Sequence, residues 1–192
     1  MKTVFFDIDT QLDFLYPSGA LYVPKAERIL PAVVHLNHFA AQHGLPVVST
    51  TDAHCEDDVE FKTWPKHCVA GTIGQHKPHS TLLHKRVVVP NRDHPLTIEG
   101  AHQIIVEKQT VDVFATVNIG RIIELLPADR YVLYGVVTEI CVLHAARGLL
   151  KTGKPLVVVT DAIEGLNPEE SERALAEIGA AGGTLTTVAE FP

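Results

Sequence analysis

Short apolar segments alternate with helical patterns along the whole chain, and this alternation restricts the fold more than any other feature of the sequence. The apolar segments are rich in β-branched residues and show little polar alternation, which is typical of strands buried on both faces. We expect strands at residues 4–8, 46–50, 87–89, 104–106, 131–137, 156–159 and 185–188.

Helical patterns separate several of these strands, and most of them carry a start signal. A polar cap or a first-turn proline marks the predicted helix starts, at Pro31, Asn118, Thr138 and Asn167. The helix that Thr138 begins is expected to reach Gly153. Repeated strand, helix and strand predict right-handed crossovers and a three-layer α/β fold, with a doubly wound, mainly parallel sheet and helices on both faces. Ligands on such sheets bind at the carboxyl ends of the strands.

Length and charge limit the number of domains and the class of partner. A chain of 192 residues fits one domain, spanning residues 1–192. With 16 Lys and Arg against 23 Asp and Glu, the formal net charge is −7, so we expect no nucleic-acid partner. The start lacks the apolar run of a signal peptide, and no stretch approaches the roughly 18 apolar residues of a membrane span. We therefore expect a cytoplasmic protein with no membrane partner, and we leave a homo-oligomer open.

One long segment, residues 52–86, shows little periodicity and is rich in reactive side chains. A non-periodic segment of this length inside a compact domain is usually functional or disordered, and its Trp and His residues favour function. Two of the three cysteines lie in it, at Cys55 and Cys68, with Cys141 outside. Three cysteines are too few and too irregular for a disulfide framework.

Three reactive side chains follow predicted strands. Asp9 comes just after the first strand, Lys108 closes the strand at 104–106, and Cys141 lies three residues after the candidate cap Thr138. A helix N-terminus favours a thiolate, so we expect a lowered pKa at Cys141. Each residue also has an interpretation without a functional role. Asp9 can belong to an acidic loop, Lys108 can be a solvated surface lysine, and Cys141 can be a buried core residue. If the sheet gathers these strand ends, the three converge as base, cation and nucleophile.

A carboxylate and two imidazoles in the 52–86 segment suggest a metal site. Asp52 and His54 follow the second strand and His67 comes later, a ligand set that suits Zn²⁺ or Fe²⁺. Chance clustering is one alternative, because the chain has 11 His. A closed zinc site that adds Cys55 and Cys68 is another, although the usual Cys-x-x-Cys spacing is missing.

Two further patterns bear on the ligand. Phe14 and Trp64 flank the polar groups and can sandwich a flat ring, with core packing as the ordinary alternative. Asp7 and Asp9 have the spacing of an aspartyl-phosphate phosphatase, but Thr10 comes one residue too early for that motif. No glycine-rich phosphate loop occurs, so nothing supports nucleotide binding.

Taken in order, these segments resemble the isochorismatase-like cysteine hydrolases, and within them the nicotinamidases and pyrazinamidases. The resemblance spans nearly the whole chain. It is carried by Asp9-Thr10-Gln11-Leu12-Asp13-Phe14, by Asp52-Ala53-His54, by Trp64-Pro65-Lys66-His67-Cys68-Val69-Ala70-Gly71-Thr72, by Lys108 and by Gly135-Val136-Val137-Thr138-Glu139-Ile140-Cys141-Val142.

The resemblance implies a sheet of about six strands and a role for each matching residue. By it, Asp9 is the general base, Lys108 the cation beside the nucleophile, and Cys141 the nucleophile. The N–H groups of Val137 and Cys141 would form the oxyanion hole, beside a non-proline cis bond between Val136 and Val137. The matching metal ligands are Asp52, His54, Glu60 and His67, and the matching substrate-binding residues are Phe14, Trp64 and Val136.

The implied activity is deamidation of nicotinamide, or a similar small planar amide, to nicotinate and ammonia through a Cys thioester, a reaction of NAD salvage. The implied cofactor is a divalent metal, zinc first, with iron and manganese as alternatives. A hydrolase of the same superfamily acting on a ureido or carbamoyl compound or on isochorismate, a phosphatase, and a catalytically silent binding protein on this fold remain alternatives.

Three positions depart from the family pattern. Leu12 stands where Asn is usual, so a polar group near the metal is expected to be absent. Asp7 replaces an apolar residue on the first strand, which implies a buried partner or local exposure. Glu139 stands where Asp is commoner, and we expect it at the first helical position, where the dipole favours an acid.

Overall fold

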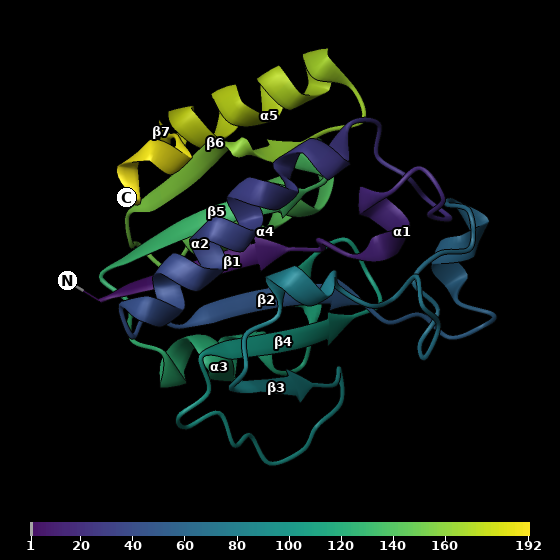
Figure 1. Ribbon diagram of the computed structural model, residues 1–192, viewed down its shortest axis with the longest axis horizontal. Coiled ribbons are helices and arrows are strands. Elements are labelled where there is room, and N and C mark those ends of the chain that lie inside the picture. The colour runs from purple at the N-terminus through teal and green to yellow at the C-terminus, as the bar shows by residue number, and fades with distance from the viewer. Residues whose placement is uncertain (1) are drawn as a thin grey trace.

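The computed structural model describes residues 2–192 and contains a single seven-stranded parallel sheet within them (Figure 1). The strand order is β3-β4-β2-β1-β5-β6-β7, and every neighbouring pair is parallel. The strands are β1 (Thr3–Ile8), β2 (Val47–Asp52), β3 (Arg86–Val89), β4 (Gln103–Lys108), β5 (Arg130–Val136), β6 (Leu156–Glu164) and β7 (Thr184–Thr186). The predicted parallel α/β fold is confirmed, with one strand more than the resemblance implied, because the three-residue β7 adds an outer edge.

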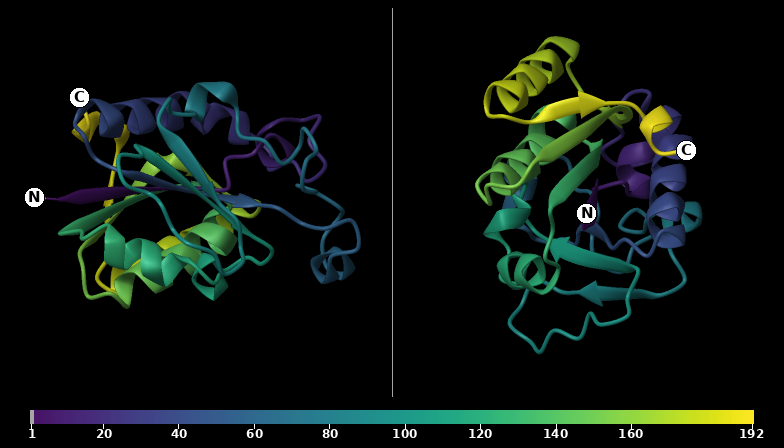
Figure 2. Two further views of the ribbon diagram at one scale, coloured as in Figure 1. Left: turned by 90° about the horizontal axis from the view of Figure 1, so that it is seen from below. Right: turned by 90° about the vertical axis from the view of Figure 1, so that its left-hand side faces the viewer.

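Helices cover both faces of the sheet, as expected. Figure 2 shows α2 on one face and α3, α4 and α5 on the other. The α-helices are α1 (Leu12–Leu15), α2 (Leu30–Gln42), α3 (Ile119–Leu125), α4 (Leu143–Leu150) and α5 (Pro168–Ala180). Single turns join them: η1 (Ala26–Ile29), η2 (Val59–Lys62), η3 (His79–Thr81), η4 (Val113–Ala115), η6 (Val188–Glu190) and the π-helical η5 (Thr138–Val142).

The predicted helix caps are confirmed at one position and wrong at two. The Asn167 side chain accepts the N–H groups of Glu169 and Glu170 at the start of α5. Asn118 makes no side-chain cap, because its amide donates instead to carbonyls of the loop after β3. Thr138 makes none either: the chain enters a π-helical turn there, and α4 ends at Leu150 rather than at Gly153. In the part of the chain that the structure describes, no helix is long and apolar enough to cross a membrane.

Strand β1 occupies the middle of the sheet, and all six of its residues are buried, including Asp7. The Asp7 carboxylate lies 3.0 Å from the buried ammonium of Lys77. It also accepts hydrogen bonds from Thr10 at 2.7 Å, Asn37 at 3.0 Å and Ser49 at 3.1 Å. Of the two explanations left open for Asp7, the structure supports a buried partner and not local exposure.

Replacing Lys77 by Met is expected to destabilise the protein by about 3–5 kcal/mol, because it leaves a buried carboxylate without its countercharge. Chemical denaturation measures this change, with the same substitution at the exposed Lys85 as the control. Adding Asp7→Asn to Lys77→Met removes the unpaired charge and should recover part of the loss. An unfolding midpoint for Lys77→Met equal to that of the Lys85 variant would show that the ion pair contributes no stability.

Candidate active site

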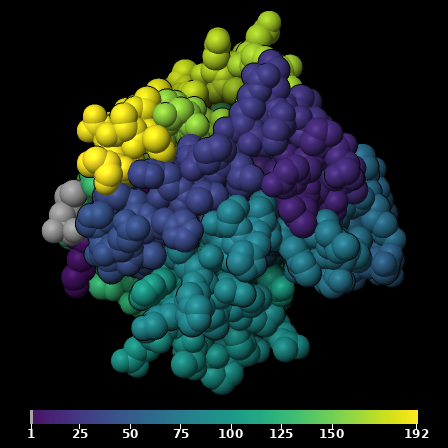
Figure 3. Space-filling view, viewed as in Figure 1, coloured from purple at the N-terminus to yellow at the C-terminus, as the bar shows by residue number. Residues whose placement is uncertain are grey.

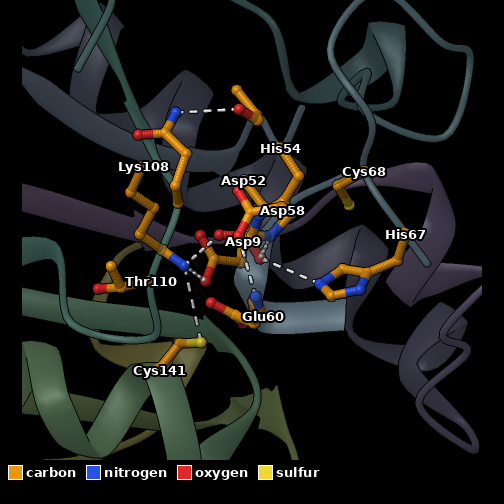
Figure 4. Close-up of polar contacts among 12 residues, drawn as sticks. Asp9, Asp52, His54, Asp58, Glu60, His67, Cys68, Lys108, Thr110 and Cys141 are labelled. Carbon is orange, nitrogen blue, oxygen red and sulfur yellow. Dashed lines mark hydrogen bonds and ion pairs between the residues drawn. The ribbon is translucent and has the colours of Figure 1, made fainter. Parts of the chain in front are cut away.

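Three side chains predicted to act together meet at the carboxyl end of the sheet (Figure 4). The Nζ atom of Lys108 lies 2.9 Å from Oδ2 of Asp9 and 3.8 Å from Sγ of Cys141. It also donates to Oδ1 of Asp52 at 2.5 Å. All four side chains are buried. The lysine therefore stands between two carboxylates and a thiol.

The parallel register of the sheet explains this convergence. Asp52 and Lys108 are the last residues of the neighbouring strands β2 and β4 and lie directly opposite each other. Asp9 follows the central strand with a φ of 47°, a left-handed conformation that Asp tolerates better than most residues. Its N–H and carboxylate are both bound by Thr50, whose hydroxyl donates to Oδ1 at 2.6 Å. The Asp9 carboxylate is thus held in one orientation.

Burial controls the protonation of these groups. It raises the pKa of the Cys141 thiol well above its ordinary value, and the attraction of Lys108 only partly offsets this. The expected lowering of that pKa is therefore wrong: the helical turn that holds the sulfur is buried against two carboxylates. Burial also raises the pKa of Asp9, against the opposing effect of Lys108. A neutral thiol needs a base before it can attack, and Asp9 is the carboxylate in reach.

Lys108 stays charged in this setting. Burial alone would lower its pKa, but Asp52 and Asp9 outweigh burial and raise the pKa well above the ordinary value. Burial likewise opposes ionisation of Asp52, yet the pKa of Asp52 is lowered because Lys108 and the two imidazoles favour its charged form. The site therefore holds a permanent ammonium beside an ionised carboxylate.

A candidate metal centre adjoins these groups. One ligand atom from each of Asp52, His54 and His67 falls within 4.8 Å of the others. Oδ2 of Asp52 is 3.8 Å from Nε2 of His54 and 3.7 Å from Nε2 of His67. Nε2 of the fully buried His54 has no hydrogen-bonding partner within residues 2–192, and it faces the Asp52 carboxylate. Buried, unsatisfied imidazole nitrogen facing a carboxylate fits a divalent metal.

Glu60 and the cysteines stand outside this three-residue group. Glu60 borders the same cavity, and burial, with Asp52 second, raises its pKa, but its role as a fourth ligand stays a prediction. Cys55 is exposed, and Cys68 points its thiol at the carbonyl of Gly74 at 3.8 Å. The described residues therefore form no closed site of two cysteines and two histidines.

An apolar cavity opens above the reactive groups. It is narrow, and its empty volume is about 410 Å³, including the part open to solvent. Its polar lining consists of Asp9, Asp52, Glu60, His67 and Cys141, and its apolar lining includes Phe14, Leu21, Trp64, Val136, Val137 and Ile140. Figure 3 shows residues of the N-terminal segment, in purple, packed beside the blue loop that carries the histidines. A flat, small ligand suits this space.

The predicted cis bond between Val136 and Val137 is confirmed, and both residues border the cavity. Glu139 lies in the first turn of η5, in line with the expectation. Its carboxylate also accepts the N–H groups of Leu166 and Asn167 and the hydroxyl of Ser171, so it fixes the loop before α5.

Several residues that hold the site in place are not evident from the sequence. The buried Gln11 accepts the Asp52 N–H at 2.7 Å and donates to the Asp52 carbonyl at 2.8 Å. Thr50 orients Asp9, and Asp58 lies against His54. Gln11 directly precedes Leu12, the position where the family pattern has Asn. No signal in composition or spacing marks Gln11, Thr50 or Asp58.

The phosphatase alternative does not match this arrangement. Asp7 and Asp9 do not face a common ligand, because Asp7 is bound to Lys77 and Thr10 while Asp9 borders the cavity.

Comparison with known proteins places the chain in a family. An isochorismatase domain matches residues 3–190. The nicotinamidase of Escherichia coli is 25% identical over 209 residues, covering 96% of this chain and 94% of that protein. The zinc complex of Pyrococcus horikoshii pyrazinamidase has a TM-score of 0.81 at 28% identity, with 97% and 99% of the two chains covered. The nicotinamidase/pyrazinamidase PncA of Bacillus subtilis has a TM-score of 0.84 at 27% identity, with 97% and 100% covered. The chain belongs to the isochorismatase family of hydrolases.

Proposed function

We propose that the protein is a metal-containing cysteine amidohydrolase that converts nicotinamide, or a similar small planar amide, to nicotinate and ammonia. The observation that carries the proposal is the contact of one buried ammonium, Lys108, with Asp9 and Cys141 beside the Asp52, His54 and His67 group. The related E. coli nicotinamidase and P. horikoshii pyrazinamidase support the same class of substrate.

The first half of the reaction forms a thioester. Asp9 accepts the thiol proton, and the sulfur of Cys141 attacks the amide carbonyl. The N–H groups of Val137 and Cys141 hold the oxyanion, and Lys108 balances the negative charge. The carbon–nitrogen bond then breaks, and Asp9 returns its proton to the departing ammonia.

The second half releases the acid. Water enters, Asp9 takes its proton, and the hydroxide attacks the thioester carbonyl. The carbon–sulfur bond breaks, the carboxylic acid leaves, and the Cys141 sulfur recovers the proton from Asp9. The enzyme returns to its starting state, and the net change is the consumption of one water per amide.

Positioning of the substrate falls to the walls of the cavity. Phe14 and Trp64 flank a planar ring and Val136 borders the carbonyl end. A divalent metal held by Asp52, His54 and His67, with Glu60 beside it, supplies when bound a Lewis acid for the ring nitrogen, directly or through water. Zinc is the first candidate, and iron and manganese are the alternatives.

Ammonia release from nicotinamide, pyrazinamide and a panel of ureido acids tests the proposal. The protein should be purified without chelator and its metal content measured on the same sample. We expect turnover of the two planar amides and about one equivalent of metal per chain. Turnover confined to ureido or carbamoyl compounds, with no metal, would assign the chain to another branch of the superfamily, and no turnover would favour a silent binding protein.

A further inference from the structure

Asp58 is a carboxylate of the site that the proposed reaction does not use. Its side chain is only 8% exposed, and Oδ2 lies 3.0 Å from Nδ1 of the fully buried His54 (Figure 4). Its other oxygen, Oδ1, accepts the N–H of Glu60 at 3.0 Å and so caps the η2 turn. Both carboxylate oxygens therefore have a neighbour in the metal-binding loop.

The geometry points to Asp58 as a positioning residue that sets the tautomer of His54 and so raises the affinity of the site for its divalent metal. This inference rests on the metal centre of the proposed function. His54 faces Asp52 with Nε2, at 3.8 Å, and Asp58 with Nδ1. A neutral imidazole that gives Nε2 to a metal carries its proton on Nδ1, and a carboxylate there stabilises that form.

The carboxylate also links two parts of the loop. Asp58 lies four residues after His54 and immediately before η2 (Val59–Lys62), which contains Glu60. The backbone N–H of Trp64 in turn donates to the carbonyl of Glu60 at 3.0 Å. One side chain thus connects the imidazole, the capped turn and the segment that leads to the cavity wall.

The chemistry of the amide explains why Asn cannot replace this carboxylate. A carboxylate offers two acceptor oxygens, whereas Asn offers one acceptor and one donor. If Asn keeps the cap to Glu60, its NH₂ group faces Nδ1 of His54 and favours the proton on Nε2, the nitrogen that the metal needs. Ser at this position also caps a helical turn but is too short to reach the ring. Both variants keep the cap and lose the acceptor.

Zinc affinity of the full-length protein tests the inference. The chelator-stripped wild type, Asp58→Asn, Asp58→Ser and Asp57→Asn are titrated with Zn²⁺ against a chromophoric chelator. Asp57 is the exposed neighbouring acid, so Asp57→Asn makes the same charge change without touching His54. We expect the Kd for zinc to rise about 10- to 100-fold in both Asp58 variants and to stay unchanged in Asp57→Asn.

A second measurement reads the tautomer itself. Long-range ¹H–¹⁵N spectra of the metal-free protein, at a pH where the ring is neutral, should show the His54 proton on Nδ1 in the wild type and on Nε2 in Asp58→Asn. Thermal unfolding of the metal-free variants checks that each is folded. A purely structural role would change the unfolding temperature without moving the tautomer.

The outcomes separate this inference from the proposed function. Zinc binding by the wild type with equal Kd values in the Asp58 variants overturns the role of Asp58 and leaves the amidohydrolase intact. Failure of the wild type to bind zinc or another divalent metal overturns the metal centre and, with it, this inference, whereas ammonia release by the same sample tests the cysteine chemistry separately.

Discussion

Replacing Cys141 by Ala is expected to abolish ammonia release, lowering kcat by about 10⁴-fold or more, because the thioester cannot form without this sulfur. The sulfur lies 3.8 Å from the Lys108 ammonium and borders the cavity. Metal content should not change, because the candidate ligand atoms belong to Asp52, His54 and His67. A steady-state assay of ammonia together with metal analysis measures both quantities.

The matched control for this substitution is Cys55→Ala. Cys55 is exposed and follows the candidate metal ligand His54, so its removal tests the effect of losing a thiol near the site. We expect wild-type turnover from that variant. Turnover by Cys141→Ala within tenfold of the wild type would rule out a thioester and favour direct attack by water.

Replacing Asp9 by Asn is expected to lower kcat by about 10²- to 10⁴-fold. Asn has nearly the same shape and keeps an oxygen for the Thr50 hydroxyl, but it cannot take a proton from the neutral thiol. Two carboxylates, those of Asp9 and Asp52, lie within 4.0 Å of the Lys108 ammonium in the described residues. The substitution leaves only that of Asp52. Single-turnover kinetics should show that formation of the acyl intermediate has slowed.

Asp57→Asn serves as the control for a change of one charge, and we expect it to retain the wild-type rate. If Asp9→Asn forms the acyl intermediate at that same rate, the base is another group. Loss of bound metal in Asp9→Asn would instead show that Asp9 acts by holding the metal centre, which the present geometry does not predict.

The positions of the strands along the chain, and the edge of the sheet at which the site forms, were accessible from the sequence. Buried apolar runs gave the strands, and parallel sheets bring their carboxyl ends to one edge. Asp9, Lys108 and Cys141 were therefore expected to meet if the sheet gathered these strand ends, and they do. The extension of β6 to Glu164 was not expected, because Thr160 and Asp161 interrupt its apolar run.

The electrostatic environment could not be predicted in the same way. The expected lowering of the Cys141 pKa took the helix start into account, but burial, which depends on the whole fold, has the larger effect. The partner of Asp7 is 70 residues away at Lys77, and no local pattern joins them. Asp58 lies only four residues after His54, but no sequence motif marks the contact between the two side chains.

We propose that Asp9, Lys108 and Cys141 together cleave a small amide through a covalent intermediate. Rapid acid quenching of the wild type during turnover of nicotinamide, followed by digestion and mass spectrometry, tests it most directly. We expect a nicotinoyl adduct on the peptide that contains Cys141, and no adduct in Cys141→Ala. Steady ammonia release with no adduct on that peptide, or an adduct on another residue, would contradict it.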